Sequence, residues 1–169
     1  FHVDSTGAAV KIDLNNGLRL EGTATVYNDL MFPFEVGENG ALTCPTFDMD
    51  SVYYTFTVDS TGNDACMMAF VVQLPHWWKE GTTIYPHVHY KHETGIGTPK
   101  FILKYKWYNI AASTAVGWNW CRMETTTGTT DKTHQMVYNS TGISGSGKTI
   151  SSIIVCKLYL RDTPANVNA

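Results

Sequence analysis

The sequence predicts an all-β fold, an antiparallel jelly-roll-like β-sandwich of about eight strands. Three observations lead to this prediction. Thr, Val, Ile, Tyr, Phe and Trp gather in short runs, as they do in strands. The runs are separated by Gly, Asn, Asp and Pro, which favour turns. Helical spacing of apolar residues occurs in only one segment, so a helical bundle is not indicated.

The first three expected strands each carry a different signature. Residues Leu18–Tyr27 alternate between the two faces of a strand, with an interruption at Gly22 that fits a bulge. Val52–Val58 is dense in β-branched and aromatic residues. Ala65–Leu74 is a continuous apolar run of strand length that ends at a proline. The remaining expected strands are Ile84–Tyr90, Phe101–Trp107, Val116–Met123, Thr133–Tyr138 and Thr149–Leu160.

The last run, Thr149–Leu160, is the segment where a helix competes with a strand. Its apolar residues at 150, 153, 154 and 158 lie close to helical spacing. The run also contains three Ile, one Val and one Thr, and β-branched residues at this density disfavour a helix. We therefore predict a strand.

The chain of 169 residues fits one domain with a substantial core. Its beginning differs from the rest, because Gly-containing turns separate short segments there. We predict an N-terminal arm or fibre-stem segment over residues 1–22 and the sandwich domain over residues 23–169. The sequence begins FHVDSTG, with neither Met nor a basic leader, which indicates processing or a preceding segment.

Composition excludes several classes of function. With 43% hydrophobic and 16% charged residues the chain is globular, and a net charge of −3 gives no reason to expect a nucleic-acid partner. No apolar run reaches the roughly 20 residues of a membrane span, so we expect no membrane insertion. The four cysteines form no C-x-x-C pair, which argues against a zinc ribbon, and are expected to be small buried residues: Cys44, Cys66, Cys121 and Cys156.

One stretch, GISGSGKT at residues 142–149, matches the phosphate-binding pattern G-x-x-x-x-G-K-[ST] through Gly142, Gly147, Lys148 and Thr149. A working loop of this kind needs a helix that begins at the Lys-Thr and a later carboxylate for Mg²⁺. Here the following segment is an expected strand, and the only later acid is Asp162. We therefore expect no nucleotide binding. The stretch should form a hairpin turn, with Gly145 and Gly147 at positive φ and Lys148 in solvent.

The histidines of the stretch YPHVHY suggest a metal site. His87 and His89 are two residues apart, so they point to the same face of a strand. With Glu93 they fit the first half of a cupin motif, in which His and Glu hold a metal, although a fourth ligand is missing because His134 lacks the context of the second motif. A second hypothesis is a metal ion shared on a threefold axis by His-x-His strands of three chains. The third interpretation is an ordinary strand with solvent-facing histidines, and no cofactor.

Exposed aromatic residues are the remaining candidates for binding. Trp77 and Trp78 are adjacent in an expected loop, and Trp118 and Trp120 lie on one face of an expected strand. Tryptophans in such places stack on sugars, fill a subunit interface or close a core. We favour core or interface for these four, with a carbohydrate site as the alternative.

Three blocks of the sequence resemble a largely uncharacterised family of tailed-phage and prophage virion proteins. The blocks are TVYNDL at residues 25–30, VQLPHWWKEGTTIYPHVHY at residues 72–90 and ISGSGKTISSIIVCK at residues 143–157. In that family A-T-V-x-D-D-L is followed by V-Q-L-P-H-x-W/Y-K-E-G, by P-H-V-H-W and by a G-x-G-K-x-I-S-S block. The match departs at Tyr90, where the family has Trp, and a closing strand like L-E-F-D-I-H-Y is absent after residue 160.

The resemblance implies a virion structural protein, in a fibre, spike or capsid-surface component, that is commonly a homotrimer. It implies assembly in the host cytoplasm, contacts with other virion proteins, and surface display or host attachment, with a host-surface glycan as a candidate ligand. It implies no enzymatic activity and no nucleotide chemistry in the G-x-G-K turn. Trimerisation would also cover exposed strand edges and aromatic patches.

Overall fold

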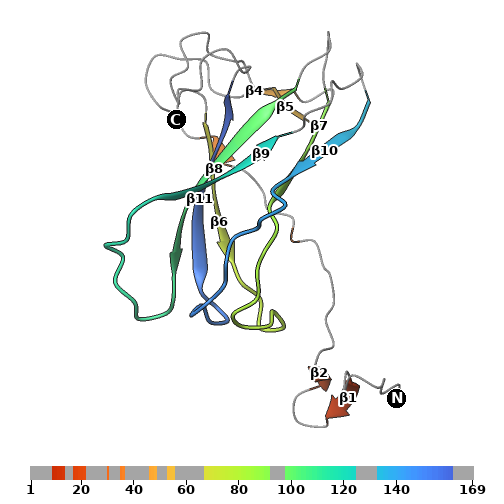
Figure 1. Ribbon diagram of the computed structural model, residues 1–169, viewed down its shortest axis with the longest axis vertical. Helices are drawn as coiled ribbons and strands as arrows, with labels where there is room; N and C mark the ends of the chain where they lie inside the picture. Colours follow the sequence, from red (N-terminus) through yellow and green to blue (C-terminus); the bar gives the residue numbers. More distant parts are fainter. Residues whose placement is uncertain are drawn as a thin grey trace. The chain divides into compact units, whose positions relative to one another are not determined.

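The computed structural model describes residues 9–13, 17–21, 30, 35–36, 46–48, 53–55, 67–91, 98–124 and 133–161. All regular structure within these residues is β-strand, and every pairing between strands is antiparallel (Figure 1). The predicted all-β, antiparallel class is therefore confirmed for the described part of the chain. None of these residues belongs to a helix that is long and apolar enough to cross a membrane.

A five-stranded sheet forms the centre of the described structure, with β11 between β6 and β8 (Figure 1). In spatial order its strands are β3 (Glu35–Val36), β6 (Met67–Gln73), β11 (Ile153–Arg161), β8 (Lys100–Tyr108) and β9 (Asn119–Glu124). The long central strands are rich in Ile, Val, Leu and aromatic residues, which suit a pleated, buried surface. One face carries the main core, and the opposite face carries a smaller buried cluster of Met67, Ile102 and Tyr159.

A smaller sheet pairs β7 (His87–Tyr90) with β10 (Gln135–Tyr138). An isolated bridge between Ile84 and Ile143 continues the contact between these two segments beyond the strands. The amide of Ile143 donates to the carbonyl of Ile84 at 2.7 Å, and the reverse bond measures 3.0 Å. Segments far apart in the sequence are thus held side by side next to the larger sheet.

Two further pairs of short strands are β1 (Ala9–Asp13) with β2 (Gly17–Glu21), and β4 (Thr46–Asp48) with β5 (Tyr53–Thr55). The chain divides into two compact units, Phe1–Met31 and Phe32–Ala169, and the first contains β1 and β2. The arm boundary after residue 22 stays a prediction.

The core lies between the two larger sheets and follows strand alternation. On β11 the even-numbered side chains Ile154, Cys156 and Leu158 are buried on the core side, and on β8 the odd-numbered positions take that place. Val137 of β10 belongs to the same buried cluster, and Val88 of β7 packs against it. The other buried members are Met68, Val72, Leu74, Phe101, Leu103, Trp107, Cys121, Met123 and Ile143.

Each of the eight expected runs overlaps an observed strand. Parts of the first three runs, including the expected bulge at Gly22, lie outside the described residues. The last one begins later than expected, at Ile153, because residues 149–152 form a turn in which Ser151 has a φ of 59°. The strand assignment of this run was nevertheless correct, so β-branched density was a better guide than the apparent helical spacing.

Candidate functional site

The phosphate-loop-like stretch lies in the connection between β10 and β11, and it is not the expected hairpin turn. β10 pairs with β7 of the smaller sheet, whereas β11 pairs with β6 and β8 of the larger one. The segment is therefore a crossover loop, residues 139–152, that passes from one sheet to the other. It leads into strand β11 rather than into a helix, so Gly147, Lys148 and Thr149 are not at a helix N-terminus.

The expectation of positive φ angles at both Gly145 and Gly147 is correct only for Gly147. Positive φ angles occur at Gly142 (73°) and Gly147 (70°), whereas Gly145 has an ordinary backbone. Gly145 is small for a different reason. A Cβ atom there would collide with the carbonyl oxygen of Thr82 and would lie 2.9 Å from the ring of Trp78. The loop therefore packs its backbone directly against the segment that precedes β7.

Lys148 is half-buried, contrary to the expectation that it lies in solvent. Its Nζ donates to the backbone carbonyl of Trp107 at 3.2 Å and lies 5.7 Å from the centroid of the Trp107 ring. This ammonium group therefore binds the loop to the end of β8 through a charge-assisted hydrogen bond and a cation–π contact.

Hydrogen bonds hold the C-terminal part of the loop on the core. The buried indole of Trp107 donates to Ser152 Oγ at 2.8 Å, and that hydroxyl donates to the carbonyl of Thr149 at 2.6 Å. Ser152 is 1% exposed, so its hydroxyl satisfies a donor that has no access to water. Asn109 adds a bond from Nδ2 to the carbonyl of Gly147 at 2.9 Å.

The same loop is joined to the stretch around LPHWWKEG. The amide of Leu74 donates to the carbonyl of Ser152 at 2.9 Å, and the amide of Ile150 donates to Glu80 Oε1 at 2.8 Å. His76 Nε2 and Ser151 Oγ are 2.8 Å apart. Residues from the second and third blocks of the family resemblance thus meet at one end of the two sheets.

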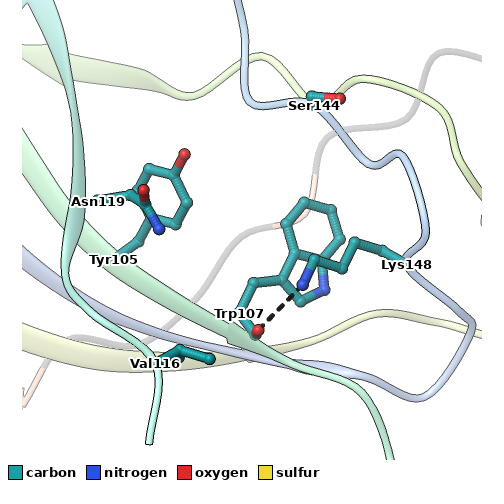
Figure 2. Close-up of a pocket in the computed structure, with 6 residues that line it drawn as sticks. All are labelled: Tyr105, Trp107, Val116, Asn119, Ser144 and Lys148. Carbon is teal, nitrogen blue, oxygen red and sulfur yellow. Dashed lines mark hydrogen bonds between the residues drawn. The ribbon is translucent and has the colours of Figure 1, made fainter. Parts of the chain in front are cut away.

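A small cleft lies beside this junction, between the crossover loop and the β8–β9 connection (Figure 2). Its volume is about 190 Å³, and its lining residues are Tyr105, Trp107, Val116, Asn119, Ser144 and Lys148. Lys148 extends over Trp107 in this view, with its ammonium on the Trp107 carbonyl. The lining residues offer hydroxyl, amide and ammonium groups for polar contacts, and none of them is a carboxylate, histidine or cysteine.

A third histidine, His134, lies beside the predicted pair His87 and His89. The rings of His87 and His89 meet edge to face with centroids 5.1 Å apart. His89 Nδ1 lies 2.8 Å from Nε2 of His134, and these two rings stack at 4.9 Å. The pairing of β7 with β10 explains the approach, because His89 is opposite Met136 and His134 directly precedes β10.

These imidazoles do not form a cage within one chain. Among the described residues, no group of three or more His, Cys, Asp or Glu side chains is arranged to hold a metal ion. Glu93, the third member of the cupin-type set, lies outside the described residues. The metal ion shared on a threefold axis stays a hypothesis that rests on other copies of the chain.

The four candidate tryptophans separate into three environments. Trp78 packs on the core, with its ring 5.8 Å from that of Trp107, whereas its neighbour Trp77 is 55% exposed. Trp118 and Trp120 are 42% and 63% exposed, beside lysines on the face of the five-stranded sheet that is opposite the core. The expectation that both lie on one strand holds for Trp120 only, because β9 begins at Asn119; Trp118 directly precedes the strand.

Two cysteines lie in the described core, and both are free thiols. Burial raises the pKa of Cys121 to about 11. Burial, followed by the nearby Cys121, raises the pKa of Cys156 to about 12. Neither thiol is a nucleophile at neutral pH, because the thiolate is the reactive form. Cys44 and Cys66 lie outside the described residues.

Comparisons with protein-family models, with curated proteins and with solved structures found no match for this chain. Two residues that matter to these sites, Ser152 and Lys157, were not predicted from the sequence, and His134 was considered as a ligand but set aside. Each is brought to its partner by pairing between strands or by loop packing. The only sequence signal was strand parity, which placed Lys104 and Lys106 on one face but could not say which strand would lie beside them.

Proposed function

We propose that this chain is a structural module of a bacteriophage particle, acting in assembly and in surface display or host attachment. The observation that carries the proposal is the junction between the crossover loop and the LPHWWKEG stretch. The residues that resemble a nucleotide-binding loop make packing contacts: Lys148 binds the carbonyl of Trp107 on β8, and Gly145 permits close packing against Thr82 and Trp78. This use fits a scaffold rather than a phosphate-transferring enzyme.

The proposal includes a jelly-roll-like sandwich and a homotrimer. Supporting the first, strands that are distant in sequence pair antiparallel, and two sheets share one core. Supporting the second, apolar side chains are exposed on the smaller sheet and before it. Tyr85, Met136 and Tyr138 are 53%, 52% and 56% exposed, which is surface that a second copy would cover.

Mass spectrometry of purified source particles tests the central proposal. We expect peptides of this chain in the assembled virion and labelling by a specific antibody on the particle surface in electron micrographs. Peptides found only in the soluble fraction of infected cells would contradict a virion role.

Light scattering on the purified full chain tests the homotrimer separately. We expect a mass three times that of the 18.8 kDa chain. A Tyr138→Glu/Met136→Glu variant should lose this association if the smaller sheet forms the contact, with Tyr108→Glu on the larger sheet as a matched control. A monomeric wild-type protein would disprove the trimer. Whether the chain is part of the virion would still be decided by mass spectrometry of the particles.

Carbohydrate binding is a second candidate function, favoured by the exposure of Trp118 and Trp120. It is compatible with a virion module that attaches to a host surface.

A further inference from the structure

The face of the five-stranded sheet opposite the main core is buried at Met67, Ile102 and Tyr159. Beside that cluster lies a set of side chains that we call the lysine–tryptophan face: Lys104, Lys106, Trp118, Trp120 and Lys157. Lys104 on β8 is directly opposite Lys157 on β11 and Trp120 on β9. Lys106 is two residues further along β8 and therefore points to the same face. Three neighbouring strands thus bring cations and indoles together.

The lysines of this face contact aromatic rings. The Nζ atoms of Lys106 and Lys157 lie 4.9 Å and 5.1 Å from the centroid of the Trp118 ring. The Nζ of Lys104 lies 4.8 Å from the ring of Tyr159. Directly opposed like charges in a sheet are unfavourable, and the aromatic quadrupoles offset part of that repulsion. The ring contacts also keep the ammonium groups close to the sheet.

Two cations of this face, Lys106 and Lys157, are positioned to bind an anion. Glu124 lies on the same face of β9 as Trp120, and it forms salt bridges with Lys100 at 3.4 Å and Arg122 at 3.9 Å. Neither Lys106 nor Lys157 has a carboxylate within salt-bridge distance among the described residues. Their positive charges are therefore available to an external anion.

Aromatic surface is available beside these charges. Trp120 is 63% exposed and Trp118 is 42% exposed, and the apolar side chain of Val71 on β6 is 56% exposed. Exposed indoles next to other apolar surface mark interaction sites, and a flat ring can stack on the C–H face of a sugar while its N–H remains available. The face combines a stacking platform with cations a few ångströms away.

We propose that the lysine–tryptophan face binds an acidic polysaccharide. Sugar rings would stack on Trp118 and Trp120, and carboxylate groups of the polymer would bind Lys106 and Lys157. The proposal rests on the proposed function, because an anionic glycan on a host surface is a ligand that a virion attachment module meets.

The charge balance favours an acidic polysaccharide over single-stranded nucleic acid. The chain carries a net charge of −3, and only a few cations lie on this face. Nucleic acid carries a phosphate on every nucleotide and is held by a dense basic groove. A polymer with carboxylates spaced along neutral sugar surface matches sparse lysines beside indoles better.

Affinity electrophoresis of the full chain tests this inference, with alginate, colominic acid, neutral dextran and an oligothymidylate as probes. We expect alginate or colominic acid to retard the protein and dextran to retard it less. Trp120→Ala should weaken the retardation about tenfold, the loss of one favourable contact. Lys106→Gln/Lys157→Gln should remove most of its dependence on salt concentration.

Trp77→Ala is the matched control, because Trp77 is also exposed, at 55%, but lies outside this face. The Trp77→Ala variant should bind the glycans as the wild type does, and circular dichroism should show that all variants are folded. Equal retardation of the wild type and Trp120→Ala, stronger binding to oligothymidylate than to either acidic glycan, or a change in oligomer mass caused by Trp120→Ala would overturn the inference. None of these outcomes bears on whether the chain is part of the virion, so the proposed function is tested separately.

Discussion

Gly145 and Gly147 occupy the same short loop but are glycines for different reasons. A side chain at Gly145 would meet Thr82 and Trp78, whereas Gly147 has open space around its Cβ position and a φ of 70°. The sequence predicted glycine-dependent turns here, because Gly-rich stretches usually supply positive φ. It could not show the close approach at Gly145, because that depends on a segment more than sixty residues earlier in the chain.

Alanine substitutions separate these two reasons. Gly145→Ala should lower the free energy of unfolding by about 1–3 kcal/mol, since the new methyl group must displace backbone atoms. Gly147→Ala should lower it by about 1–2 kcal/mol through backbone strain alone. Gly117→Ala is the control, with no atom within 4 Å and no positive φ, and should be neutral or slightly stabilising. Urea denaturation measures all three, and equal values for Gly145→Ala and Gly117→Ala would refute the packing explanation.

Ser152 is a single hydroxyl that the core depends on. Ser152→Ala removes the acceptor of the Trp107 indole and leaves that donor buried, because Trp107 is 4% exposed. We expect a loss of about 1–3 kcal/mol in the free energy of unfolding, the usual cost of an unsatisfied buried polar group. Ser146→Ala, on the exposed part of the same loop, should change stability little. Indistinguishable denaturation midpoints for the two variants would show that the buried hydrogen bond contributes nothing.

At the scale of elements, runs dense in β-branched and aromatic residues made the strands predictable, whereas the pairing between strands was not predictable. The runs that became β8 and β11 were correctly expected as strands, because dense β-branched and aromatic residues signal a pleated surface. Nothing local specifies that β11 lies between β6 and β8. For the same reason the approach of His134 to His89, and of Lys157 to Lys104, needed the observed register.

Adjacent isoleucines on β11 test the alternation of this strand. Ile154 is 2% exposed on the core side, and Ile153 is 39% exposed on the opposite face. Ile154→Ala should cost about 2–5 kcal/mol, since it leaves a cavity between the two sheets. Ile153→Ala removes the same atoms and the same β-propensity at the surface and should cost less than about 1 kcal/mol. Similar losses in urea denaturation would mean that the register of β11 is wrong.

At the scale of the whole molecule, titration of the core thiols links stability to pH. Burial raises the pKa of Cys121 from about 9 to about 11 and that of Cys156 from about 9 to about 12. The pKa of Tyr105 is raised in the same direction, by burial and then by Cys121. The folded chain thus keeps these protons after the unfolded chain has released them. This contribution to stability is complete below about pH 9 and is lost as the pH rises towards about 11–12.

We therefore expect the free energy of unfolding to fall between about pH 9 and pH 11, measured by urea denaturation in a reducing buffer. The variant Cys121→Ala/Cys156→Ala should be less stable at neutral pH, because it loses buried atoms, but should decline less steeply in this window. The difference between the two slopes reports the thiols together with their effect on the pKa of Tyr105. Parallel curves would contradict the assignment. A native wild-type protein whose Cys121 and Cys156 react rapidly with a thiol reagent at pH 8 would do so as well, since burial is what keeps both groups protonated in the folded chain.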